Sequence, residues 1–288
     1  MALRIAVLGN CQAVTLARRL ERLCPQAEVI TVSWARVASP ERAEAIADEV
    51  VRCDVVLTQP LDKPAYGPLR SDSLIGRAAG RVQLWPRLYF TGLHPDVVSA
   101  DKSQGLGAPF GSNHSALIMA GYALGFGPAR TAELFNAYAY GVLGYFDEFA
   151  KAEAFMADSA RAVGLEFRPL LDRWRGRVSF HVPHHPVAAL IEDLAVLLCD
   201  ALGLSRQVAA EPTRDAFANY RNEWPVYPEI ARRLGMEGSL VFRRHAAPRE
   251  IDLEQTIALF HEGYAVAGRA DVGRFVRPAM ETLRAEGF

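Results

Sequence analysis

Short apolar runs alternate with amphipathic stretches along the first part of the chain. The apolar runs have the lengths of buried strands and are rich in β-branched residues. They cover residues 3–8, 28–34, 54–57 and 81–85. After the first run, Val14, Leu16, Ala17, Leu20 and Leu23 recur with the spacing of one helix face. Strands that alternate with helices in this way predict an α/β fold with a mostly parallel, doubly wound sheet and helices on both faces.

Two further helices are expected between these strands. Ser39-Pro40-Glu41 places a capping residue before a proline at the first helical position, which predicts a helix over residues 41–51. A shorter helix is expected near residues 71–79, after a loop rich in proline and glycine.

The pattern changes after residue 96. A glycine-rich loop over residues 103–115 leads into helical segments that reach about residue 164. A late strand at 177–182 and a helix at 187–202 follow. We therefore expect an α/β core over residues 1–204 that contains a helical insertion at about 104–170. Residues 205–288 are expected to form a helical C-terminal extension that caps the core.

Composition excludes several classes of protein. The chain carries 32 basic and 33 acidic residues, a formal net charge of −1, and so lacks the basic surface that a duplex nucleic-acid binder needs. No apolar run has the length of a membrane span, and no signal peptide is recognised at the amino terminus, so a cytoplasmic protein is expected. The 4 cysteines form no CxxC pair and no Cys/His zinc pattern, which predicts free thiols and no structural metal.

Chemically versatile side chains follow the ends of the predicted strands. They are Cys11, Gln59, His94, Asp96, His184 and His185. In an open parallel sheet, ligands bind outside the carboxyl ends of the strands, near the point where the strand order reverses. We therefore expect these residues to converge on one edge of the sheet.

Cys11 is the candidate nucleophile. It stands where the first strand gives way to a helix, so backbone N–H groups and the positive helix end are expected to lower the pKa of its thiol. A histidine could serve as its base and Asp96 could orient that imidazole. The N–H groups of the turn, with the amide of Gln59 or Asn10, could meet an oxyanion. The alternative for Cys11 is a small buried apolar side chain.

The other candidates also have structural explanations. Gln59 could satisfy backbone groups at the strand end, and Asp96 could cap the segment after His94. Asn113 or Ser115 could cap a helix, which leaves Asn113 and His114 ambiguous. His181 is expected to be structural, since it lies within a predicted strand.

Two other enzyme classes fit less well. A low-molecular-weight cysteine phosphatase needs Cys-x5-Arg, and here Ala17 stands six positions after Cys11, with the arginine one place later at Arg18. A dinucleotide-binding turn needs GxGxxG, which is absent from the first turn.

Four short motifs follow one another along the chain: Gly9-Asn10-Cys11-Gln12, Gln59-Pro60, Leu93-His94-Pro95-Asp96 and His185-Pro186. In this order they resemble the WcbI-type polysaccharide biosynthesis proteins. The similarity continues through residues 143–147 and 225–238 and so covers most of the chain.

The resemblance implies a flavodoxin-like core related to the SGNH hydrolases, and a protein that binds coenzyme A and acetylates capsular sugars. In the SGNH arrangement Cys11 would take the place of the nucleophile, Gln59 that of the oxyanion amide, and His185 that of the base. The chain departs from that pattern, because Gly-Asn-Cys replaces Gly-Asp-Ser and no Asp-x-x-His precedes the last helix. The family's late motif, Asn-His-Pro, favours His185 over His184.

A coenzyme A site would need groups that bind the phosphates of the coenzyme. The expected cofactor-binding residues are Gly9, Asn10, Gln12, Gln59, Lys102, Asn113 and His114. The start of the first helix is one anion site, and Lys102 or Arg87 could add a cation.

The leading hypothesis is an acetyl-CoA-dependent acetyltransferase that acts on a sugar hydroxyl in surface or capsular polysaccharide biosynthesis. Its catalytic residues would be Cys11, His185, His94 and Asp96, with no metal, no nucleic acid and no membrane span. Direct transfer and transfer through an acyl-cysteine both remain open, as does a homo-oligomeric state. The alternatives are a noncatalytic coenzyme A or glycan-binding protein, a scaffold, and an SGNH-like esterase.

Overall fold

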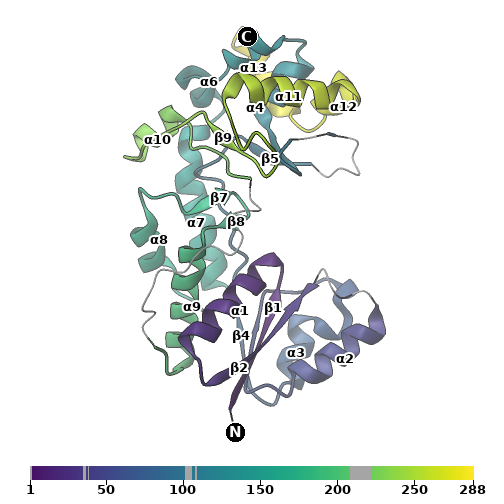
Figure 1. Ribbon diagram of the computed structural model, residues 1–288, viewed down its shortest axis with the longest axis vertical. Helices are drawn as coiled ribbons and strands as arrows, with labels where there is room; N and C mark the ends of the chain where they lie inside the picture. The colour runs from purple at the N-terminus through teal and green to yellow at the C-terminus, as the bar shows by residue number, and fades with distance from the viewer. Residues whose placement is uncertain (1, 35–36, 38, 101–105, 108, 208–221) are drawn as a thin grey trace. The chain divides into compact units, whose positions relative to one another are not determined.

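The computed structural model describes residues 2–34, 37, 39–100, 106–107, 109–207 and 222–288. The chain forms two compact units, each made of separate stretches of sequence (Figure 1). Unit 1 comprises Met1–Leu88, Phe155–Trp174 and Pro186–Ala216. Unit 2 comprises Tyr89–Ala154, Arg175–His185 and Phe217–Phe288. The expected division into domains 1–204 and 205–288 stays a prediction.

Unit 1 contains the predicted parallel sheet. Its strands are β1 (Leu3–Gly9), β2 (Ala27–Ser33), β3 (Val55–Thr58) and β4 (Arg81–Leu84). They lie in the order β2-β1-β3-β4, and every pair is parallel. The α/β fold class expected from the alternating apolar runs is confirmed.

Helices flank this sheet because its central strand is apolar on both faces. The helices of unit 1 are α1 (Cys11–Leu23), α2 (Pro40–Val50), α3 (Ser71–Arg77), α8 (Arg168–Trp174) and α9 (Ala188–Leu202), with the 3-10 helix η2 (Pro64–Leu69). Of these, α8 packs against α9. Helix α1 packs against β1, β2 and α9, whereas α2 packs against η2 (Figure 1). Ala6 and Leu8 of β1 join the same buried cluster as Ala47 of α2 and Leu74 of α3.

Unit 2 is mainly helical, as the sequence predicted for residues 116–164 and for the C-terminal region. Its helices are α4 (Ala116–Ala123), α5 (Pro128–Ala132), α6 (Ala137–Val142), α10 (Pro228–Arg233), α11 (Leu253–Ala265), α12 (Arg269–Gly273) and α13 (Arg277–Ala285), with the 3-10 helix η4 (Tyr145–Asp147). The long helix α7 (Glu148–Arg161) begins in unit 2 and ends in unit 1. Short strands β5 (Val97–Ser99) and β6 (Asn113–Ser115) pair antiparallel, as do β9 (Phe242–Arg243) and β10 (Glu250–Ile251).

The late strand expected at 177–182 is shorter and is placed differently. It is β7 (Phe180–Val182), and it pairs with β8 (His185–Pro186) in a separate two-stranded sheet. The prediction that it extends the parallel sheet was wrong. Only Pro183 and His184 separate β7 from β8, and so short a connection suits a hairpin, whereas parallel neighbours need a long crossover.

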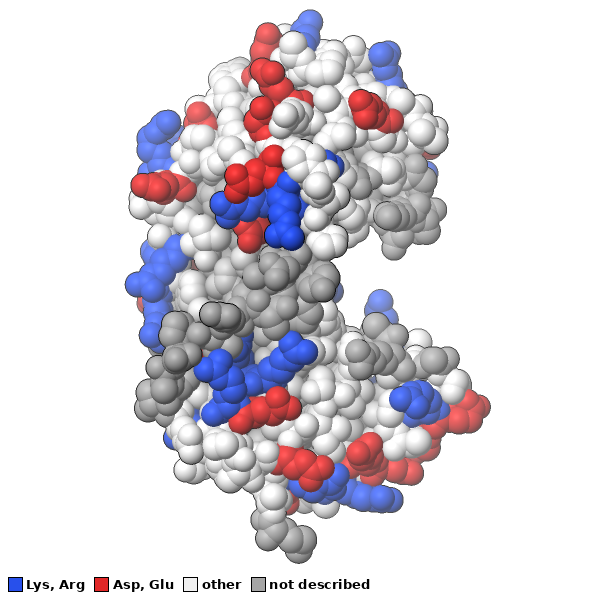
Figure 2. Space-filling model, in the orientation of Figure 1, with Lys and Arg blue, Asp and Glu red and all other residues white. Residues whose placement is uncertain are grey.

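The described helices include none that is both long enough and apolar enough to cross a membrane. Acidic and basic side chains are interspersed on the face that Figure 2 shows, in keeping with the net charge of −1.

Candidate functional site

The turn over residues 9–12 lies at the carboxyl edge of the sheet in unit 1. Strand β1 ends at Gly9 and β3 ends at Thr58, and the two strands are direct neighbours. The chain moves to one side of β1 to form β2 and to the other side to form β3, so the strand order reverses here. Cys11 and Gln59 therefore share the edge at which ligands of such sheets bind, as predicted.

Position 9 requires a glycine because the side chains of Trp85 and Gln59 lie close to its Cα atom. A Cβ atom at this position would lie 2.8 Å from Cζ2 of Trp85 and 3.0 Å from Oε1 of Gln59. Both distances are too short for ordinary packing, so a larger residue would displace the Gln59 amide.

Gln59 holds the turn through its side-chain amide. The backbone N–H of Asn10 donates to Oε1 of Gln59 at 3.1 Å, and Nε2 of Gln59 donates to Oε1 of Gln12 at 3.3 Å. The residue is 1% exposed, so these bonds lie out of water and are costly to lose. The amide predicted to meet an oxyanion is therefore already bonded at both polar atoms within the protein.

Gln12 ties the turn to the chain that follows β4. Its Nε2 donates to the carbonyl of Leu88 at 2.7 Å, and its Oε1 accepts from the N–H of Leu88 at 3.1 Å. Gln12 is also buried. Two glutamines separated by 47 positions thus form one buried amide network beneath the turn.

Asn10 caps helix α1, and Cys11 is its first residue. Oδ1 of Asn10 accepts from the N–H of Gln12 at 2.9 Å, which satisfies one of the unpaired donors at a helix start. This cap sets the direction in which the chain leaves β1, and it places Cys11 at the positive end of the helix.

Cys11 is exposed, whereas Cys24, Cys53 and Cys199 are buried. The structure thus rules out the reading of Cys11 as a small buried side chain. Although its surface is reached by water, the protein around it raises the pKa of the thiol by making the thiolate harder to solvate. The N–H groups of Cys11 and Gln12 and the guanidinium of Arg87 lower that pKa, but by less. The prediction of a lowered thiol pKa was therefore wrong.

Asp96 lies in unit 2 and is fully buried. One carboxylate oxygen accepts from the N–H of Leu117 at 2.8 Å and from the hydroxyl of Tyr145 at 3.1 Å, and the other accepts from the hydroxyl of Tyr227 at 2.7 Å. Burial raises the pKa of Asp96, and a hydrogen bond from the Ser115 hydroxyl together with these three opposes that rise. No histidine of the described residues hydrogen-bonds to its carboxylate.

The candidate bases differ in their surroundings. His94 is 1% exposed, and burial lowers its pKa to about 3, so its imidazole is neutral at physiological pH and holds a proton poorly. His184 and His185 are half-buried, and their ring centroids lie 4.3 Å apart. Strand β4 ends at Leu84, so His94 does not directly follow it, and all three histidines belong to unit 2.

Asn113 and His114 are buried in β6 of unit 2. Nδ2 of Asn113 donates to the carbonyl of Phe110 at 3.4 Å, and Nδ1 of His114 lies 2.8 Å from the hydroxyl of Tyr264. Burial lowers the pKa of His114 to about 4. Lys102, the other cofactor-binding candidate from this region, lies outside the described residues.

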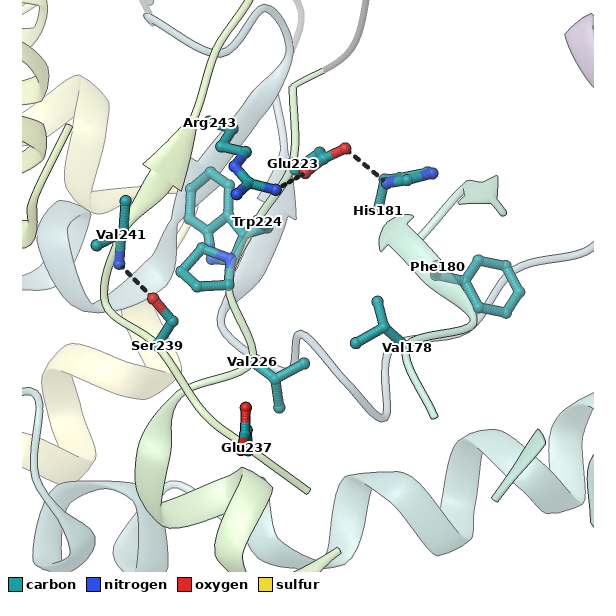
Figure 3. Close-up of a pocket in the computed structure, with 11 residues that line it drawn as sticks. Val178, Phe180, His181, Glu223, Trp224, Val226, Glu237, Ser239, Val241 and Arg243 are labelled. Atoms are coloured by element: carbon teal, nitrogen blue, oxygen red, sulfur yellow. Dashed lines mark hydrogen bonds and ion pairs between the residues drawn. The ribbon is translucent and has the colours of Figure 1, made fainter. Parts of the chain in front are cut away.

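A polar cavity of about 280 Å³ in unit 2 was missed by sequence reasoning. Figure 3 shows Glu223 between His181 and Arg243. Its carboxylate oxygens lie 3.3 Å from Nδ1 of His181 and 3.2 Å from Nη1 of Arg243. The bond to His181 and the charge of Arg243 lower the pKa of Glu223 to about 2. The three residues are far apart in sequence and form no motif, so nothing in the chain pointed to their meeting.

The sequence model of the family described as polysaccharide biosynthesis enzyme WcbI matches residues 4–207. The chain belongs to this family. The match spans the Cys11 turn, Gln59, His94 and His185, the positions that carried the resemblance in the sequence.

One solved structure of the family resembles the whole chain. Its TM-score is 0.77 at 18% sequence identity, and the alignment covers 98% of this chain and 99% of that chain. It is described as WcbI, a novel polysaccharide biosynthesis enzyme, in a native form without a disulfide bond between coenzyme A and one of its cysteines. At this identity the likeness shows a shared fold. No curated protein sequence matches the chain.

Proposed function

We propose that this protein is an acyltransferase that moves the acetyl group of acetyl-CoA to a hydroxyl of a sugar in surface or capsular polysaccharide biosynthesis. The observation that carries the proposal is the exposed thiol of Cys11, held by a buried amide network at the start of α1. Membership of a polysaccharide biosynthesis family supports a saccharide acceptor.

The description of the related structure supports coenzyme A as the carrier. That description names a disulfide bond between coenzyme A and one cysteine of that protein, a bond that the solved native form lacks. In this chain Cys11 is the exposed cysteine, and the start of α1 with the nearby charge of Arg87 favours an anion such as a phosphate. Gly9, Asn10 and Gln12 would shape this binding turn.

In the covalent version, a base takes the proton of Cys11 and the thiolate attacks the thioester carbonyl. The oxyanion that forms is stabilised by N–H groups at the start of α1, and coenzyme A leaves as its thiol after taking up a proton. A sugar hydroxyl then gives its proton to the base and attacks the acyl-cysteine, which forms the ester and restores the thiol. Because the pKa of Cys11 is raised, this version depends on a base.

His185 is the preferred base in this proposal. His94 has a pKa of about 3 and would hold a transferred proton poorly at neutral pH. In the direct version the same base activates the sugar hydroxyl, and Cys11 contributes to the oxyanion pocket without forming a bond to the acetyl group.

Mass spectrometry of the protein after mixing with acetyl-CoA tests the role of Cys11. The covalent version predicts an added acetyl group on Cys11 that is absent from Cys11→Ala and unaffected in Cys53→Ala, which alters a buried cysteine. Turnover without an adduct would refute the covalent version. Turnover that persists in Cys11→Ala would refute a catalytic Cys11 altogether.

A noncatalytic coenzyme A-binding protein is the second candidate, and the raised pKa of Cys11 favours it, since a protonated thiol is a weak nucleophile. It predicts that acetyl-CoA binds but that no sugar ester forms with any acceptor. An esterase would release acetate with no acetylated sugar. Product analysis with and without a saccharide acceptor therefore separates the three functions.

A further inference from the structure

A second cavity in unit 2, of about 450 Å³, lies among α4, α12 and α13. Figure 1 shows these helices side by side, and α4 contacts both of the others. The volume is in the range of sites that hold small ligands. Its lining includes the arginines Arg269, Arg274, Arg277 and Arg284.

Ala123, Gly273 and Met280 form an apolar, closely packed part of the cavity lining, which we call its floor. A Cβ atom on Gly273 of α12 would lie 3.2 Å from Sδ of Met280 on α13 and 3.4 Å from Cβ of Ala123 on α4. The four arginines are exposed, so a ligand would meet a firm floor and charged side chains that water can reach.

The positive charge of this cavity is poorly compensated. Arg274 pairs with Asp271 at 3.7 Å, whereas Arg269, Arg277 and Arg284 make no ion pair with any described residue. Glu281 is the acidic residue of the lining. In a chain whose net charge is −1, such a local excess of guanidinium groups attracts an anion.

The placement of two arginines on α13 indicates the form of the anion. Arg277 and Arg284 are seven positions apart and therefore lie on one helix face, about 10 Å apart along the axis. Arg277 is also the first residue of α13, where the helix dipole disfavours a cation. Charges spread over this length suit an extended ligand with several anionic groups better than one compact phosphate.

We propose that this cavity binds an anionic saccharide chain, whose carboxylate, phosphate or sulfate groups pair with Arg269, Arg277 and Arg284. Guanidinium groups bind such anions through two parallel hydrogen bonds, and neutral sugar rings can lie over the apolar floor. The inference deepens the proposed function and rests on it, because it names the acceptor as an anionic polysaccharide.

Calorimetry with the full chain and a short chain of galacturonic acid tests the proposal in the absence of acetyl-CoA. The wild type should bind this ligand, and binding should weaken as salt is raised. The double variant Arg277→Gln/Arg284→Gln should weaken binding about tenfold or more. The double variant Arg277→Lys/Arg284→Lys should restore part of the binding, because lysine keeps the positive charge but lacks the planar guanidinium that donates two parallel hydrogen bonds. Arg42→Gln/Arg52→Gln removes the same charge from exposed positions of unit 1 and should bind like the wild type.

Three results would overturn the proposal. They are no binding of the galacturonic acid chain, equal loss in the two glutamine double variants, and equally tight binding of a neutral galactose chain or of uridine diphosphate. Circular dichroism of each variant confirms that the fold is retained. Since binding is measured without the acyl donor, a failure of acetyl transfer with intact saccharide binding would count against the proposed function alone.

Discussion

At the scale of single residues, Cys11 has a thiol that is exposed to solvent but whose pKa is raised. Its position at the start of α1 supplies the N–H groups that favour a thiolate, yet the surrounding protein has the larger and opposite effect on the pKa. The sequence pattern revealed the first influence and could not reveal the second, because burial depends on segments distant in the chain. At neutral pH the thiol therefore stays mostly protonated.

The pH dependence of alkylation follows from this raised pKa. Iodoacetamide reacts with the thiolate, so the labelling rate of Cys11 should rise about tenfold per pH unit from neutral pH and should still be rising at the ordinary pKa of a cysteine. Arg87→Gln should slow labelling at a given pH, since the lost cation raises the pKa further.

Mass spectrometry of the labelled protein gives the rate and the site. The native protein should carry one label, because Cys24, Cys53 and Cys199 are buried, and Cys11→Ala should carry none. A labelling rate that levels off below the ordinary cysteine pKa would contradict the raised value.

At the scale of elements, the strand β1, the turn and the helix α1 form the part of the site that sequence predicts best. The structure agrees with the apolar run, the Gly-Asn-Cys-Gln turn and the helical spacing seen in the sequence, within a residue or two at the boundaries. For Gln59 the sequence allowed an oxyanion amide or a partner of backbone groups at the strand end, and its bond from the N–H of Asn10 is of the second kind. Its particular partners, Asn10 and Gln12, could not be predicted because they lie 49 and 47 positions away. Its side-chain amide stabilises the turn through hydrogen bonds with Asn10 and Gln12.

Replacing this amide tests the supporting role. Gln59→Ala removes both hydrogen bonds and leaves the N–H of Asn10 without its acceptor, so the free energy of unfolding should fall by about 1–3 kcal/mol. Denaturant unfolding measures the change. Gln26→Ala, which removes an exposed hydrogen bond to the carbonyl of Ser205, should change stability by less than about 0.5 kcal/mol. Equal stability of the two variants would show that the amide network contributes nothing.

At the scale of the whole molecule, the sequence predicts the parallel sheet and the helical regions but not how distant segments combine. Each compact unit draws on separate stretches of the chain, and no composition change marks their borders. The late strand was assigned to the wrong sheet because a short apolar run does not disclose its partner. The arrangement of polar groups inside unit 2 depends on the same long-range pairing.

Asp96 shows the consequence of that pairing. Its motif suggested a residue that orients a histidine, whereas its carboxylate accepts hydrogen bonds from Leu117, Tyr145 and Tyr227, up to 131 positions away. A buried carboxylate that accepts several hydrogen bonds connects several helices and loops of the unit. Its contribution to stability is therefore expected to exceed that of an exposed carboxylate.

Asp96→Asn should lower the free energy of unfolding by about 2–4 kcal/mol, because an amide nitrogen would then face a backbone N–H or tyrosine hydroxyl donor in the interior. Thermal or denaturant unfolding measures the loss. Tyr227→Phe removes one donor to Asp96 and also the acceptor of the Trp224 Nε1–H bond, so it should cost about 1–3 kcal/mol. Asp172→Asn breaks an exposed ion pair with Arg168 and should cost less than about 1 kcal/mol. If Asp96→Asn were as stable as Asp172→Asn but inactive in acetyl transfer, Asp96 would belong to the catalytic machinery, as its motif first suggested.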